Sequence, residues 1–128
     1  MAGCLQGCWG GINTNIEGHK KRAKEIEDSL GKLLPDPDGK HVVAIVELTY
    51  GIAQHSIASG MENKYGKHLD THAGLPRELR RLGAIDIAMI FETIDMFRAG
   101  RWYGSKGNGD VVQQCLEFIE KIEEWASK

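Results

Sequence analysis

Two arginines, a lysine and two aromatic residues lie close together near position 100. They are Arg98, Arg101, Trp102, Tyr103 and Lys106. A guanidinium group offers a planar fork of donors that fits a phosphate, and an aromatic ring offers a surface on which a base can stack. Cations near the end of a helix also complement its dipole, and aromatic side chains also close the end of a bundle. The first interpretation predicts a binding site for a phosphate-bearing ligand, and the second predicts only local stability.

Histidines are a second source of chemistry. His68 and His72 are four residues apart, so on a helix they would share one face, and Asp70 lies between them. A zinc or iron site would need further ligands, for which His55 and Glu47 are candidates. Glycines flank the pair and weaken the assumption of a helix, and the carboxylate-x-x-His repeats of di-iron bundles are missing. We therefore expect no metal and no other cofactor.

Cysteines are sparse in this chain. Cys4, Cys8 and Cys115 are an odd count that does not resemble a disulfide framework, which favours a reducing, cytoplasmic setting. Cys4 and Cys8 form a pair, but no second cysteine pair follows to complete a tetrahedral zinc site. The first 13 residues are rich in glycine and have no periodicity. We interpret residues 1–13 as an irregular arm with a frayed end.

Composition limits the class of protein. The chain has 128 residues and a formal net charge of -2, which indicates one domain and argues against a protein that coats nucleic acid non-specifically. Hydrophobic residues make up 41%, which is ordinary for a globular protein. No stretch reaches the roughly 18 apolar residues that span a bilayer. The chain also has no P-loop and no nucleophile elbow, so the common nucleotide-hydrolase and esterase motifs are excluded.

Apolar residues at helical spacing predict four long helices and one short helix. Thr14 and Glu17 have the spacing of a capping box, and Asp110 is placed to cap the last helix. Short connections make neighbouring helices antiparallel, so residues 14–128 are predicted to form a single all-α, up-and-down bundle of four to five helices. The predicted helices cover about residues 14–34, 40–59, 75–82, 84–98 and 110–127. In the second helix, Val43, Leu48 and Tyr50 are expected to widen the buried face.

The order of these segments resembles the HEPN family, especially its small stand-alone members. A helix containing VELTYGIAQHSIASGM precedes DTHAGLPRELRRLG, and a helix ending in FRAGRWYG precedes the closing helix QQCLEFIEKIEEW. The resemblance covers about residues 15–128, and its last 60 or so residues carry most of it. The positions that match the family's motifs are Thr71, His72, Gly74, Arg98, Tyr103, Gly104, Phe118 and Ile119.

The resemblance implies a four- or five-helix bundle that often dimerises and binds RNA or nucleotides. Many members are toxins, or partners of small nucleotidyltransferases. Nuclease members carry an arginine followed four to six residues later by a histidine, where the arginine holds the scissile phosphate and the histidine handles a proton. Here the residue five positions after Arg98 is Tyr103, and no histidine follows His72. A tyrosine with a pKa of about 10 is a poor base at neutral pH. We therefore favour a binding function over a nuclease function.

The sequence therefore predicts a non-catalytic HEPN-like domain, possessing no catalytic residue, which binds RNA, a nucleotide or a protein partner. Arg98 would contact phosphate, Arg101 and Lys106 would supply positive charge, and Trp102 or Tyr103 would stack. We expect a cytoplasmic homodimer related to toxin–antitoxin systems, with a nucleotidyltransferase-type partner and no membrane contact. Three alternatives stay open: a metal-independent ribonuclease toxin with an atypical site, a metal-binding bundle that uses His55, His68 and His72, and a structural or assembly module.

Overall fold

The chain folds into helices, as the apolar periodicity predicts. The computed structural model describes residues 12–67, 74–100 and 108–128, and 81% of these residues are helical, with no strand among them. The expected all-α class is confirmed. The five helices of the described residues are α1 (Ile12–Gly31), α2 (Val42–Tyr65), α3 (Leu75–Arg81), α4 (Ile85–Arg98) and α5 (Asn108–Ser127).

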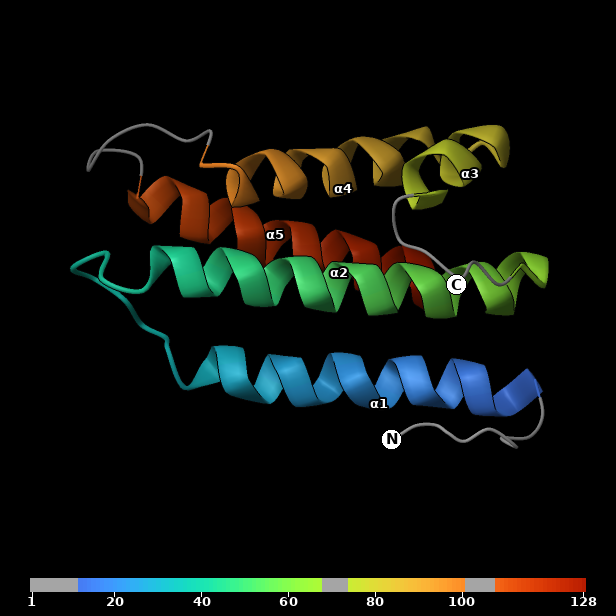
Figure 1. Ribbon diagram of the computed structural model, residues 1–128, viewed down its shortest axis with the longest axis horizontal. Helices are drawn as coiled ribbons and strands as arrows, with labels where there is room; N and C mark the ends of the chain where they lie inside the picture. Colours follow the sequence, from blue (N-terminus) through green and yellow to red (C-terminus); the bar gives the residue numbers. More distant parts are fainter. Residues whose placement is uncertain (1–11, 68–73, 101–107) are drawn as a thin grey trace.

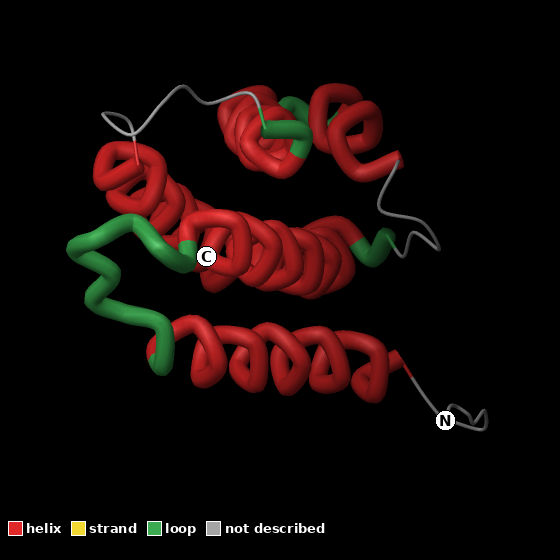
Figure 2. Tube along the Cα trace, turned by 60° about the vertical axis from the view of Figure 1, so that its left-hand side comes forward, coloured by secondary structure: helices red, strands yellow, loops and turns green. Residues whose placement is uncertain are grey.

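Successive long helices reverse direction, so the bundle is of the up-and-down kind. Figure 1 shows α1, α2, α4 and α5 alternating in direction, with the short α3 beside the start of α4. The helices form three layers: α1 on one side, α2 with α5 in the middle, and α4 with α3 on the other side (Figure 2). α2 is the central helix, since it packs against α1, α4 and α5. α2 and α5 therefore run parallel along a diagonal of the bundle.

The core lies along α2 and is built from the residues that the helical spacing selects. The apolar residues that recur at helical spacing along α2 are buried, and Ile45, Ile52 and Ile57 are fully enclosed. They meet buried side chains of α4 and α5, including Phe91 and Ile122. The expectation for Val43 is wrong, because 69% of its surface is exposed. Val43 lies in the first turn of α2, on the side that no neighbouring helix covers.

The second helix is predicted to end near residue 59, but Gly60 lies inside α2. A Cβ atom at this position would be 2.6 Å from Cζ3 of Trp125 and 3.0 Å from Ala126. The missing side chain thus lets α2 and α5 approach closely. A glycine inside a helix costs about 1 kcal/mol relative to alanine, and this close packing offsets that cost. The helix continues to Tyr65 and ends at Gly66, whose φ is +66°.

Two helices, α1 and α5, each begin about two residues before the N-cap residue that the sequence suggests. α1 begins at Ile12 and α5 at Asn108, so Thr14 and Asp110 lie inside the first turns and neither is the N-cap. The short helix is confirmed, with Pro76 in its first turn and Gly83 at a φ of +90° just beyond it. Before α2, the Asp36 carboxylate accepts hydrogen bonds from the amides of Lys40 and His41, both at 3.0 Å.

Among the helices of the described residues, none is both long enough and apolar enough to cross a membrane.

Candidate functional site

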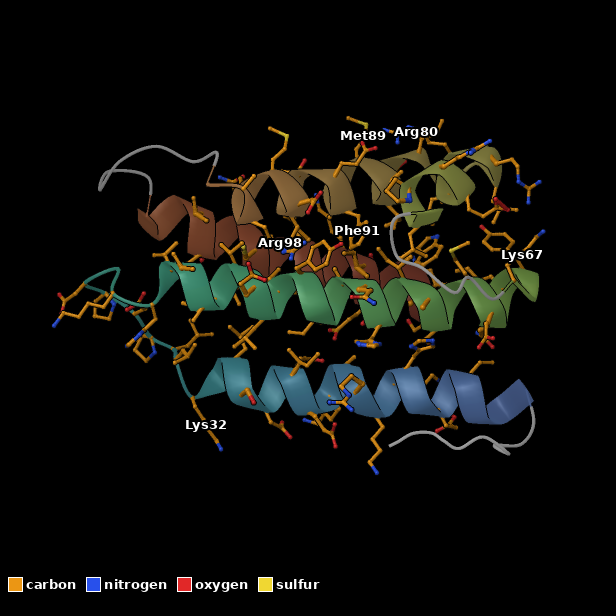
Figure 3. All side chains as sticks on the ribbon, in the orientation of Figure 1. Lys32, Lys67, Arg80, Met89, Phe91 and Arg98 are labelled. Atoms are coloured by element: carbon orange, nitrogen blue, oxygen red, sulfur yellow. The ribbon has the colours of Figure 1, made fainter. Side chains whose placement is uncertain are left out.

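Arg98 is the last residue of α4, and its side chain reaches across to α2. Its guanidinium carbon lies 3.9 Å from the ring centroid of Tyr50. The Tyr50 ring in turn stacks on Phe91 of α4, with centroids 5.0 Å apart and ring planes 21° from parallel. Figure 3 shows Arg98 and Phe91 in the space between α4 and α2. A cation and two aromatic rings therefore form one stack that joins the two helices.

Two carboxylates fix the orientation of this guanidinium. Nε of Arg98 donates to Oε1 of Glu47 at 3.2 Å, and Nη1 donates to Oδ1 of Asp95 at 3.1 Å. Neither bond uses Nη2. Arg98 keeps 34% of its side chain exposed, so the group is ordered and still reachable from solvent. Glu47 and Tyr50 share one face of α2 because they are three residues apart, and the same spacing places Asp95 beside Arg98 on α4.

Tyr50 remains a neutral donor at physiological pH. Burial raises the pKa of its hydroxyl above 10, and the nearby carboxylates of Asp95 and Glu47 act in the same direction. Arg98 opposes this shift only in part. A phenol with a raised pKa is a poor general base, so Tyr50 orients Arg98 and does not take up protons.

A small hollow opens next to the guanidinium. Its volume is about 50 Å³, and Val46, Glu47, Phe97, Arg98 and Gly100 are among the residues that line it. For comparison, one water molecule takes up about 30 Å³ in the liquid. The hollow therefore admits a group of a few atoms but not a nucleobase. The exposed Val43 also lines it, which places an apolar edge beside a charged one.

Of the five residues predicted to bind a ligand, the structure places Arg98. Arg101, Trp102, Tyr103 and Lys106 lie outside the described residues. The chain leaves α4 at Arg98, and the last described residue before that gap is Gly100, on the edge of the hollow.

The sequence prediction missed the partners of Arg98. Glu47 and Tyr50 were assigned no role in the site, although their spacing of three on a helix is a signal that a polar face exists there. Asp95 was likewise assigned no role in the site. No sequence pattern pairs Glu47 with Arg98, because the two residues are 51 positions apart.

The structure describes only some of the residues considered as ligands of a zinc or iron site. His68 and His72 lie outside the described residues. Glu47 bonds Arg98, whereas His55 lies beside His19, with 3.0 Å between their Nδ1 atoms. Eight helical residues separate Glu47 from His55, which is about 12 Å along the axis of α2. Across residues 12–67, 74–100 and 108–128, no three His, Cys, Asp or Glu side chains are grouped to hold a metal ion.

A polar cavity of about 390 Å³ lies between α1, α2 and α5. Glu27 and Glu123 face it from two sides, with the hydroxyls of Ser56 and Ser59 on α2. Burial, reinforced by Glu27, raises the pKa of Glu123 to about 7. The Glu123 carboxyl on α5 therefore holds its proton into the neutral range, in a cavity that Glu27 of α1 also lines.

A cleft of about 760 Å³ with both apolar and charged walls lies between α4 and α5. Met89, Ile90, Phe118 and Trp125 contribute apolar walls, and Met89 points outward from α4 with 57% of its surface exposed (Figure 3). Cys115 is not a candidate nucleophile, because it is fully buried and burial raises the pKa of its thiol to about 11.

Comparison of the chain with protein-family models, with curated proteins and with solved structures finds no match.

Proposed function

We propose that this chain is a non-catalytic, HEPN-like binding module, and that it holds a phosphate group of RNA or of a nucleotide at the corner around Arg98. The observation that carries the proposal is the fixed pose of Arg98 above Tyr50. An arginine that is already oriented loses less side-chain entropy when it binds an anion. The hollow beside it has room for the few atoms of a phosphate.

Within the described residues, the corner carries a negative excess, because Glu47 and Asp95 together outweigh Arg98 by one charge. The proposal therefore assigns Arg101 and Lys106, which follow in the sequence, the role of supplying the positive charge that an anion needs. A phosphate therefore binds only when both the oriented Arg98 and these two cations contribute, and Trp102 or Tyr103 then stacks on a base.

We prefer a binding role because of the chemistry of the described residues around Arg98. Cleavage of RNA needs a group that exchanges protons near neutral pH. In the described part of the corner, Tyr50 has a raised pKa and the Glu47 carboxylate is bonded to Arg98. The toxin–antitoxin role, the nucleotidyltransferase-type partner and the homodimer rest on the resemblance to HEPN proteins alone.

The proposal is tested by binding of a fluorescent single-stranded RNA, with nucleotides as competitors. A hydrogen bond to a charged group contributes about 1.5–3 kcal/mol, so Arg98→Ala is expected to weaken binding roughly 10- to 100-fold. The slope of log K against log salt should fall by about 0.7 when one contact to single-stranded RNA is lost. Arg77→Ala on α3 is the matched control, because it removes one exposed arginine at the other end of α4.

Two results would overturn this function. Equal losses in the Arg98 and Arg77 variants would indicate general electrostatic attraction and no site. RNA cleavage in excess EDTA that disappears in Arg98→Ala would replace the binding module with the metal-independent ribonuclease.

A further inference from the structure

The polar cavity between α1, α2 and α5 is a groove with α2 as its floor. α1 and α5 each pack against α2, and the cavity of about 390 Å³ lies between them. Four of its lining residues have small side chains, which leaves room between the helices: Ala23, Ser56, Ser59 and Ala126. Sites for small molecules usually measure roughly 300–1,000 Å³. The groove is therefore large enough for a small organic ligand.

Two serine hydroxyls on the floor of the groove have unused hydrogen-bonding capacity. Ser59 is 3% exposed and Ser56 is 8% exposed, and both line the groove. Within residues 12–67, 74–100 and 108–128, neither side chain has a hydrogen-bond partner. Neither hydroxyl is completely enclosed, so both can be reached from the groove. Buried polar groups are nearly always paired, so these two hydroxyls indicate a polar occupant.

Carboxylates face the groove from two helices. Glu27 lines it from α1 and Glu123 from α5, and both side chains are half-buried. Glu27 acts on Glu123 through a hydrogen bond and through its charge, and Glu120 adds a further negative charge. Like charges repel over such short distances, so the groove disfavours an anionic ligand.

The two lysines beside the groove do not neutralise it. Nζ of Lys24 donates to Oδ1 of Asp28 at 3.1 Å, and 73% of the Lys24 side chain is exposed. Lys20 is exposed as well. Asp28 and the three glutamates are four carboxylates against two ammonium groups, which leaves an excess of two negative charges when all of them are ionised. The groove therefore favours a cation.

We propose that this groove binds a small aliphatic amine in its protonated form, with the ammonium group between Glu27 and Glu123 and with Ser59 as the third acceptor. An ammonium group has three donors and no acceptor, which matches two carboxylates and one hydroxyl. Hydrogen bonds between charged groups are also stronger than neutral ones. A bare metal ion fits less well, because the described part of the chain groups no three His, Cys, Asp or Glu side chains to hold one.

Binding of the amine is coupled to the ionisation of Glu123. Burial, reinforced by Glu27 and Glu120 and opposed by Lys24, raises the pKa of Glu123 to about 7. An ammonium group favours the ionised carboxylate, so Glu123 releases its proton as the amine binds. About a tenth of Glu123 is ionised at pH 6 and about nine-tenths at pH 8, whereas an alkyl amine with a pKa of about 10.4 stays protonated at both. The affinity should therefore rise about tenfold between these two pH values.

Calorimetric titration of the full chain, freed of nucleic acid, with putrescine (a linear four-carbon diamine) tests the site. We expect one amine per chain, release of a proton on binding at neutral pH, and a melting temperature that rises with putrescine. Glu27→Gln and Glu123→Gln each remove one charged acceptor and should weaken binding roughly 10- to 100-fold at pH 8. Ser59→Ala keeps a small side chain on the helix and should weaken binding about fivefold.

Matched controls separate this site from general attraction of cations. Glu117→Gln removes the same charge from an exposed position of α5, so it should bind putrescine like the parent chain. Equal losses in the Glu117 and Glu123 variants would overturn the site, as would a Kd of the parent chain for putrescine above about 1 mM. Tetramethylammonium and protonated butylamine carry equal charge, but only butylamine has N–H donors, so butylamine should bind at least about tenfold more tightly. Equal affinity for the two would overturn the hydrogen bonds to Glu27, Glu123 and Ser59.

Discussion

The guanidinium of Arg98 lies 3.9 Å from the centre of the Tyr50 ring, and that ring stacks on Phe91. The contact joins the end of α4 to the middle of α2. A cation over an aromatic ring contributes about 0.5–2 kcal/mol, and a stacked aromatic pair about 0.5–1.5 kcal/mol. The same contact thus serves the stability of the fold and the orientation of the proposed ligand site.

Tyr50→Leu is expected to lower the free energy of unfolding by about 2–3 kcal/mol, because both ring contacts are lost. It should also weaken RNA binding, since Arg98 would no longer be held in one pose. Urea denaturation and RNA titration measure the two effects. Tyr50→Phe is the control that keeps the ring, and it should retain most of the stability and the binding. A Tyr50→Leu protein that binds RNA as tightly as the parent would show that the stack does not position Arg98.

Glu47→Gln is expected to tighten RNA binding a few-fold. Glu47 is 52% exposed and bonds Nε of Arg98, so the substitution deletes a negative charge from the corner while the glutamine amide oxygen can still accept from Nε. The exposed ion pair contributes at most about 1 kcal/mol to stability, and the variant should therefore remain folded. Binding isotherms at low and high salt measure the change. Glu25→Gln on α1 removes an equal charge elsewhere, and an equal gain in that variant would contradict a local effect.

The fold was largely predictable from the sequence, because each long helix carries its own apolar stripe. Ile45, Ile52 and Ile57 are buried where their spacing on α2 predicts. The errors fall where a tertiary contact decides the outcome. Gly60 has the local signal of a helix breaker, yet it lies within α2 because Trp125 packs against its backbone.

The site was predictable only at Arg98, which stands at a helix end among other cations. Its partners on α2 come from a segment about 50 residues earlier, and their side chains meet it only after α2 and α4 have packed. The contact between His19 and His55 has the same origin. Helical periodicity assigns residues to faces, but it does not say which residues of two faces will oppose each other.

Gly60→Ala is expected to destabilise the protein by about 1–3 kcal/mol, although alanine favours a helix over glycine. The added Cβ would lie 2.6 Å from Trp125 and 3.0 Å from the backbone of Ala126, and the backbone cannot move aside cheaply. Gly18→Ala on α1 is the matched control, because nothing lies within 4 Å of its added Cβ. That variant should stabilise the protein by about 0.5–1 kcal/mol. Thermal unfolding of both variants gives the comparison, and a stabilised Gly60→Ala protein would contradict the close approach of α2 and α5.

The last prediction concerns pH and the carboxyl pair of Glu27 and Glu123. Burial and Glu27 raise the pKa of Glu123 to about 7 in the folded protein, whereas an unfolded glutamate titrates near pH 4.3. The folded state therefore binds the proton more tightly, and the free energy of unfolding should fall as the pH rises from about 4.3 to about 7. Glu120 adds to this shift, and Lys24 opposes it.

Glu123→Gln replaces a carboxyl that ionises near pH 7 with a permanently neutral group, so it should stabilise the protein strongly at pH 8 and much less at pH 5. The measurement is urea denaturation across this pH range. Glu117→Gln on the exposed face of α5 is the control, and its stability should follow that of the parent chain at every pH. If Glu123→Gln destabilised the protein equally at pH 5 and pH 8, the carboxyl of Glu123 would be ionised in the folded state throughout, which would contradict its raised pKa.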